Sequence, residues 1–176
     1  MLFPQPDGPT IDTNSLSAAQ IETRSKAVRP PNCMVISTAW LYKIPHSGGQ
    51  TSGNADIAVV QIGSDYESFP LSTNQWVGCN GAVNTASYRL QAQWSTLSFA
   101  FALQSHTPPD LVVEWTVIAD GATIYSGTAK PGDPFERLEL DVFGVRDLQF
   151  TARTDSICGT ADKGYAALVQ GYVAAR

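Results

Sequence analysis

Charged residues are scarce in this chain. Asp, Glu, Lys and Arg together make up 15% of its 176 residues, and the formal net charge is −5. Proteins that bind nucleic acid neutralise phosphates with clustered Lys and Arg, and no such cluster is visible along the sequence. We therefore expect no nucleic-acid partner.

Long apolar runs are also absent. No segment approaches the roughly 18 consecutive apolar residues that indicate a membrane-spanning helix, so we expect no membrane insertion. Residues 1–7 have neither the basic nor the apolar region of a secretion signal. This leaves three locations open: a protein that stays where it is made, a trimmed extracellular fragment, or a virion component released by lysis.

Cysteine and histidine are too few for a disulfide scaffold or a zinc site. The three cysteines are Cys33, Cys79 and Cys158, and the two histidines, at positions 46 and 106, add no metal-ligand spacing. Cys79 and Cys158 each lie beside a glycine. They either form a disulfide that leaves Cys33 free, or all three stay reduced. We expect no cofactor; a calcium ion would have Asp155 and Asp162 as its ligands.

The common catalytic motifs are missing as well. The sequence contains no G-x-S-x-G elbow, no Walker P-loop, no G-x-G-x-x-G and no H-E-x-x-H. His106 lies in a polar run with two prolines, which is typical of an exposed loop. The acidic pairs Asp65 with Glu67 and Glu139 with Asp141 have the spacing of solvated strand faces. The sequence therefore predicts a protein that is not an enzyme.

Alternation of apolar and polar residues is the main pattern that the chain does have. From Trp94 to Arg153, four runs place apolar side chains at every second position, which puts them on one face of a strand. These faces begin at Leu97, Leu111, Leu138 and Leu148. Between the second run and Thr123-Ile124-Tyr125, the pair Asp120-Gly121 supplies the positive φ angles of a type I′ hairpin. The runs are too close together for crossover helices, so we expect antiparallel pairing.

The rest of the chain from Cys33 onward also has the pattern of strands and turns. Further strands are expected over Cys33–Tyr42, Asp56–Ile62 and Tyr165–Val173, with a loop over Pro45–Asn54 and a turn-rich segment over Ser64–Asn84. A total of about eight strands predicts an all-β fold, an antiparallel β-sandwich of jelly-roll type.

An N-terminal arm precedes this sandwich. Residues 1–31 are rich in Pro, Asn, Ser and Thr and lack alternation, whereas residues 32–176 form the predicted sandwich domain. The capping-box spacing at Ser17–Gln20 predicts a short helix over Ala18–Ala27, which Pro30-Pro31 would end. Because the arm has too few apolar residues to order alone, we expect it to contact protein subunits; a flexible tail is the alternative.

Three segments of the body contain motifs that occur together in a known family. They are Tyr88-Arg89-Leu90, Leu97–Leu103 and Val113–Tyr125. These segments are similar to the Y-x-L, F-x-A-x-x-G and F-x-V-x-x-D-G-x-x-L-Y elements of the NPCBM family of carbohydrate-binding modules. Leu140–Phe150 is similar to its V-D-V-x-G-x-x-x-L-x-L element. The family has a glycine after the strand that corresponds to Leu97–Leu103, and this chain has Leu103-Gln104 there instead. The resemblance implies a carbohydrate-binding β-sandwich with a glycan or cell-surface polysaccharide as partner.

Sugar binding requires exposed aromatic rings that stack on sugar faces and polar side chains that read hydroxyl groups. The candidate ligand-binding residues in this sequence are Tyr66, Asn74, Gln75, Trp76, Asn80 and Trp94. The sequence therefore predicts a recognition or structural module with a carbohydrate-binding fold, whose arm makes subunit contacts. The alternative is a bacteriophage virion structural or decoration protein, in which the fold serves assembly or attachment to the host.

Overall fold

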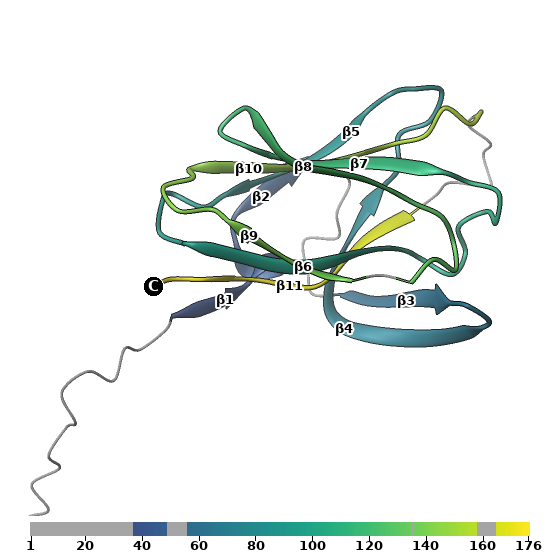
Figure 1. Cartoon of the computed structure of the whole chain (residues 1–176), viewed down its shortest axis with the longest axis horizontal. Helices are drawn as coiled ribbons and strands as arrows, with labels where there is room; N and C mark the ends of the chain where they lie inside the picture. The colour runs from purple at the N-terminus through teal and green to yellow at the C-terminus, as the bar shows by residue number, and fades with distance from the viewer. Residues whose placement is uncertain (1–36, 49–55, 135, 158–164) are drawn as a thin grey trace, which may run out of the picture. The chain divides into compact units, whose positions relative to one another are not determined.

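Two antiparallel β-sheets form the described part of the chain (Figure 1). The computed structural model describes residues 37–48, 56–134, 136–157 and 165–176. All of them belong to the unit Met34–Arg176. The predicted arm with its helix, Cys33, Cys158 and Asp162 lie outside the described residues, so the boundary at residue 31 stays a prediction. Within the described ranges, no helix has the length and apolar composition of a membrane span.

The larger sheet, called sheet A, has the strand order β3-β4-β11-β6-β9, and β1 also pairs with β11. Its strands are β1 (Thr38–Trp40), β3 (Asp56–Ile62), β4 (Asp65–Trp76), β6 (Thr96–Leu103), β9 (Arg137–Asp141) and β11 (Tyr165–Ala174). A 3-10 helix, η1 (Leu41–Lys43), follows β1.

The second sheet, called sheet B, has the order β2-β5-β10-β7-β8. Its strands are β2 (His46–Gly48), β5 (Asn84–Arg89), β7 (Val113–Ala119), β8 (Ala122–Ala129) and β10 (Asp147–Arg153). The pairings within sheets A and B are antiparallel. This confirms the all-β sandwich that the alternation predicts.

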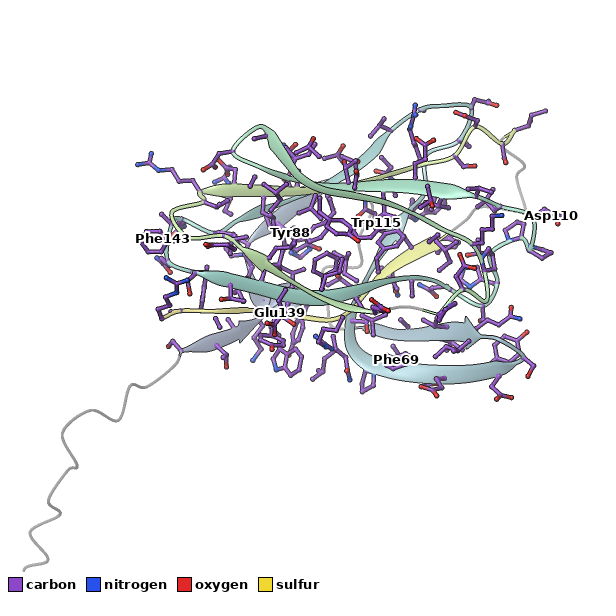
Figure 2. The ribbon with its side chains drawn as sticks, viewed as in Figure 1. Phe69, Tyr88, Asp110, Trp115, Glu139 and Phe143 are labelled. Carbon is purple, nitrogen blue, oxygen red and sulfur yellow. The ribbon has the colours of Figure 1, made fainter. Side chains whose placement is uncertain are left out.

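The main core lies between sheets A and B. Alternate residues of β6, β7 and β10 point inward, and Phe99, Val117 and Phe150 are each at most 1% exposed. Phe99 meets Phe150 edge to face, with ring centroids 5.1 Å apart. Figure 2 shows Tyr88 and Trp115 in the same space between the layers. The burial of these residues confirms the inward faces that alternation predicts for β6, β7 and β10.

The predicted hairpin joins β7 to β8. Asp120 and Gly121 have φ angles of 46° and 86°, as a type I′ turn requires. The Asp120 carboxylate also accepts hydrogen bonds from the backbone N–H groups of Arg146 and Asp147 at 3.1 and 2.9 Å. This turn therefore also anchors the loop before β10.

Two segments differ from the sequence-based expectations. The turn-rich segment is mostly one long strand, β4, because its first half pairs with β3 and its second half with β11. Leu71, with φ of 62°, lies where the pairing changes partner. His46–Gly48, expected in a loop, forms β2 by pairing with β5.

The β3–β4 hairpin bends away from the rest of sheet A, packs over the outer side of β6 and β11 and builds a second, smaller core (Figure 1). Ala58 and Val60 of β3 are buried against Ala100 and Ala102 of β6, with Val169 of β11 completing the contact. The small alanine side chains permit this close approach. Strand β3 is therefore buried on one side only: Ala58 and Val60 are at most 2% exposed, whereas Ile57 is 59% exposed.

Candidate functional site

A cleft opens where the sandwich is not closed, between the edge strand β8 of sheet B and the edge strand β9 of sheet A. Its volume is about 390 Å³. Aromatic side chains from β6, β7 and β8 line its inner side, and polar side chains from β3 and the β8–β9 loop line its rim. We call this cavity the β8–β9 cleft.

Three stacked aromatic rings connect the core to this cleft. Phe101 and Trp115 are nearly parallel, with centroids 4.4 Å apart and planes 9° apart. Trp115 and Tyr125 are stacked next, with centroids 5.0 Å apart and planes 27° apart. Phe101 and Trp115 are buried, whereas Tyr125 is half-buried. Tyr125 is therefore the ring of this stack that a ligand can reach.

Gly127 allows the tryptophan to lie beneath β8. A Cβ atom at position 127 would lie 3.0 Å from Nε1 of Trp115, which is closer than such contacts normally are. The side chains of Tyr125 and Ala129 share the inward face of β8 with this glycine, since alternate residues of a strand point the same way. The local sequence of β8 thus positions the accessible ring.

The rim of the cleft is held in place by backbone hydrogen bonds. The Asp133 carboxylate accepts the Lys130 N–H at 2.9 Å, and the Asp133 N–H donates to the Lys130 carbonyl oxygen at 3.1 Å. Gly63, in the β3–β4 turn, donates its N–H to the carbonyl oxygen of Gly132 at 3.1 Å. The β8–β9 loop is therefore held both by its own hydrogen bonds and by the β3–β4 turn.

The charged side chains on this rim are available to a ligand. Lys130 and Glu136 line the cleft and are exposed. Among the described residues, the recorded ion pair joins Arg153 to Glu114, away from the cleft. Lys130 can thus donate hydrogen bonds and Glu136 can accept them. An aromatic ring beside such donors and acceptors can stack on the apolar face of a sugar while its hydroxyl groups are read.

No metal centre is indicated within the described residues, because no group of three or more His, Cys, Asp or Glu side chains there could hold an ion. Asp155 is exposed, and its predicted calcium partner Asp162 falls outside those residues.

The aromatic residues proposed from the sequence lie elsewhere. Tyr66 is 62% exposed on β4. Trp76, at the end of β4, meets Tyr165 edge to face with centroids 5.0 Å apart. Trp94 is half-buried against the main core. None of them lines the β8–β9 cleft.

The polar candidates also lie outside the cleft. Asn74 is half-buried within β4, and Asn80 is exposed in a turn with φ of 52°. Gln75 is 1% exposed, and its Nε2 donates to the carbonyl oxygens of Asn84 and Phe150 at 3.2 and 3.0 Å. Gln75 joins the two sheets from inside, so it cannot contact a ligand at the surface; it is a structural residue.

Cys79 lies in a loop that is held against the end of β10. Thr154 donates its N–H to the Gly78 carbonyl oxygen at 2.7 Å, and Asn80 donates to that of Ser156 at 3.0 Å. Cys79 is disulfide-bonded. Its predicted partner Cys158 is outside the described residues, so this pairing stays a prediction.

Tyr125 was missed because the sequence presents it only as part of a hairpin strand. The available signal was the loop that follows. Lys130 to Pro134 combines charge, glycine and proline directly after a strand, and loops on a rigid scaffold often carry function.

Solved structures of carbohydrate-binding modules have this fold. A CBM51 module from Clostridium perfringens GH95, in complex with methyl-galactose, matches with a TM-score of 0.60 at 10% identity, over 78% of this chain and 99% of that chain. A Clostridium perfringens ZmpB structure, with CBM51-2 in complex with GlcNAc, matches with a TM-score of 0.56 at 13% identity, over 79% of this chain and 29% of that chain.

A third match is the tandem CBM51 modules of Sp3GH98, a family 98 glycoside hydrolase from Streptococcus pneumoniae. The TM-score is 0.56 at 14% identity, over 76% of this chain and 41% of that chain. In this and the ZmpB structure, the chain spans less than half of the matched length.

No protein-family model matches the sequence, and no curated protein matches it significantly. The virion role has no support among these structures and stays a prediction of the sequence alone. The fold implied by the motifs at Tyr88–Leu90 and Leu140–Phe150 is confirmed: the described sandwich has the fold of a carbohydrate-binding module.

Proposed function

We propose that this chain is a non-enzymatic glycan-binding module and that the β8–β9 cleft holds the sugar. The observation that carries the proposal is the position of Tyr125, an accessible ring stacked on Trp115 beside the charged rim of a cavity. Two matched structures contain a sugar, methyl-galactose in one and GlcNAc in the other, which supports this class of ligand.

The size of the cleft favours a short ligand. A cavity of about 390 Å³ is near the lower end of the range for small-molecule sites. The sugar stacks on Tyr125, while Lys130 donates to its hydroxyl groups and Glu136 accepts from them. The proposed ligand is therefore the terminal sugar of a glycan rather than a long internal stretch.

The arrangement of acids supports binding rather than hydrolysis. Glycoside hydrolases commonly place two carboxyl groups on either side of the scissile bond. In the cleft, one oxygen of the Asp133 carboxylate accepts the Lys130 N–H, which gives this acid a structural role in the loop. Glu136 is the other acid that lines the cleft, and no hydrogen bond of its side chain is recorded among the described residues. It can accept a hydrogen bond from a sugar hydroxyl group.

The test begins with a glycan array on the full chain, followed by titration calorimetry with the best ligand. Lys130→Gln and Glu136→Gln should each weaken binding several-fold, because each removes a charged hydrogen-bonding group. Their stability should change by less than about 0.5 kcal/mol, since both side chains are exposed. An array with no glycan above background would overturn the proposal.

The arm has a separate proposed role. Residues 1–31 would contact protein subunits, as their composition suggests. Light scattering on the chain with and without these residues tests this role. An unchanged number of subunits per particle after their removal would contradict it.

A further inference from the structure

The outer face of sheet B is hollowed at its β2–β5–β10 end. Two adjoining cavities of about 490 and about 470 Å³ share Arg89 of β5 and Asp147 of β10. Polar side chains of β2, β5 and β10 line the first cavity, and the turns after β5 and before β10 line the second. We call the two together the β5–β10 groove. It shares no lining residue with the β8–β9 cleft.

Two arginine side chains in this groove have no partner among the described residues. Arg89 lies directly opposite Asp147 in the antiparallel register, yet the recorded ion pair of the described residues is Arg153 with Glu114. The Arg137 guanidinium donates to Ser98 and to the Gln170 carbonyl oxygen. No such bond is recorded for the side chains of Arg89 and Arg146, and both residues are exposed.

A shortage of acidic residues does not explain why no ion pair is recorded for these two arginines. The chain has 16 acidic residues and 11 basic ones. Two arginines nevertheless line one cavity without an ion pair, although Asp147 lines it too. Their donors therefore remain free for an external group.

The backbone beneath the arginines is rigid and strained. Gln91 and Ala92 have φ angles of 56° and 58°, in the left-handed region that costs a residue with a Cβ atom about 1–2 kcal/mol. Their N–H groups donate to the carbonyl oxygens of Arg146 at 3.1 Å and Val145 at 2.8 Å. The turn after β5 is thus fixed against the loop that carries Arg146.

The loop that carries Arg146 is fixed from its other side as well. Its N–H donates to the Asp120 carboxylate at 3.1 Å, and the next N–H, of Asp147, donates to the same group at 2.9 Å. Asp120 is thereby occupied by backbone donors. Strained backbone that the surroundings hold in place is commonly found at binding sites.

We propose that the β5–β10 groove binds an acidic saccharide. The guanidinium groups of Arg89 and Arg146 hold the carboxylate or sulfate of the sugar, because a guanidinium donates two parallel hydrogen bonds to such an anion. Asp147 and Gln149 read neighbouring hydroxyl groups from β10. This second site goes beyond the proposed function of the β8–β9 cleft and does not depend on it.

The test is titration calorimetry on the full chain with three oligosaccharides of equal length: a uronic-acid oligosaccharide, a sulfated one and a neutral one. Arg89→Gln and Arg146→Gln should each weaken binding of the acidic ligand by about tenfold, as expected for the loss of a charge-assisted hydrogen bond. Higher ionic strength should weaken it further. Thermal melting of each variant checks that the sandwich remains folded.

Arg153→Gln is the matched control. Arg153 is on the same outward face of the same strand as Asp147, at the opposite end of β10, and the substitution removes the same charge. Its exposed ion pair with Glu114 contributes little to stability. Binding of the acidic ligand should therefore be unchanged in this variant.

The outcomes separate the alternatives. If only the uronic-acid ligand binds, the group held by the groove is a carboxylate, and if only the sulfated ligand binds, it is a sulfate. If both bind, the groove accepts either anion. The proposal is overturned if neither acidic ligand binds, if the neutral one binds equally well, or if Arg153→Gln weakens binding as much as Arg146→Gln. A Tyr125→Ala variant that loses the cleft ligand should keep the acidic one, which separates failure of this site from failure of the β8–β9 cleft.

Discussion

The phenol ring of Tyr125 lies on the indole of Trp115, with centroids 5.0 Å apart and planes 27° apart. Trp115 is in turn stacked on Phe101, which is part of the main core. The accessible ring of the candidate site is therefore supported by the main core. A ring held in this way loses little conformational freedom when a sugar binds, which favours affinity.

Replacing Tyr125 tests this site. Tyr125→Ala should weaken glycan binding by about tenfold or more, because truncating an aromatic residue at the centre of a binding site commonly costs over 1.4 kcal/mol. Tyr125→Phe keeps the ring and should stay within a few-fold of the wild type. Titration calorimetry with the best array ligand measures both.

Two other aromatic residues provide the comparison. Phe143 is 75% exposed in the turn between β9 and β10 and is labelled in Figure 2. Phe143→Ala should leave glycan affinity unchanged. Tyr66→Ala tests the site predicted from the sequence: if it abolishes binding while Tyr125→Ala does not, the site lies on β4 and the cleft is the wrong assignment.

Replacing a phenylalanine of the core should lower the free energy of unfolding far more than replacing an exposed one. Phe150 is 1% exposed and contacts Phe99 and Tyr88 edge to face. Phe150→Ala should lower the free energy of unfolding by about 3–5 kcal/mol, and Phe143→Ala by less than about 0.5 kcal/mol. Urea unfolding followed by tryptophan fluorescence measures both values. Equal effects would contradict the assigned inward face of β10.

The strands around that core were predictable because alternation is a local signal. Leu97 and Phe99 in β6, or Leu148 and Phe150 in β10, report a buried face within a few residues of sequence. The hairpin at Asp120-Gly121 was equally local. These elements needed no knowledge of which strands are neighbours in the sheets.

The site was not predictable in this way, because accessibility depends on strand order. Tyr125 is accessible because β8 is an edge strand, and the residues of β8 itself do not show this. Gln75 is buried because β4 pairs with β11, where it lies opposite Ala166. Its polar neighbours in the sequence suggested a loop, whereas the distant pairing makes a strand.

The disulfide of Cys79 has a predicted partner. Non-reducing peptide mapping should link the Cys79 peptide to the Cys158 peptide and find Cys33 free to react with an alkylating reagent. Cys158→Ser should then lower the free energy of unfolding by about 2–4 kcal/mol, the usual contribution of a disulfide. A link between Cys79 and Cys33 would refute the pairing.

Alkaline pH should destabilise the sandwich through Tyr88. Burial raises the pKa of Tyr88 to about 12 from the ordinary value of 10.0, and its hydroxyl lies 3.5 Å from the Thr73 hydroxyl oxygen. The folded state therefore keeps a proton that the unfolded state releases between these values. Its contribution to stability is complete below pH 10 and is lost as the pH rises towards about 12.

The variant Tyr88→Phe isolates this effect, because it keeps the ring packed against Phe150 and removes only the titrating group. The loss from Tyr88 ionisation approaches about 2–3 kcal/mol, at roughly 1.4 kcal/mol for each unit of pKa shift. The free energy of unfolding of the variant should therefore fall less steeply above pH 10 than that of the wild type. All other ionisable groups are common to the two proteins, so comparing their urea unfolding across this range isolates the contribution of Tyr88. Parallel pH dependences would show that Tyr88 ionises as freely in the folded chain as in the unfolded one.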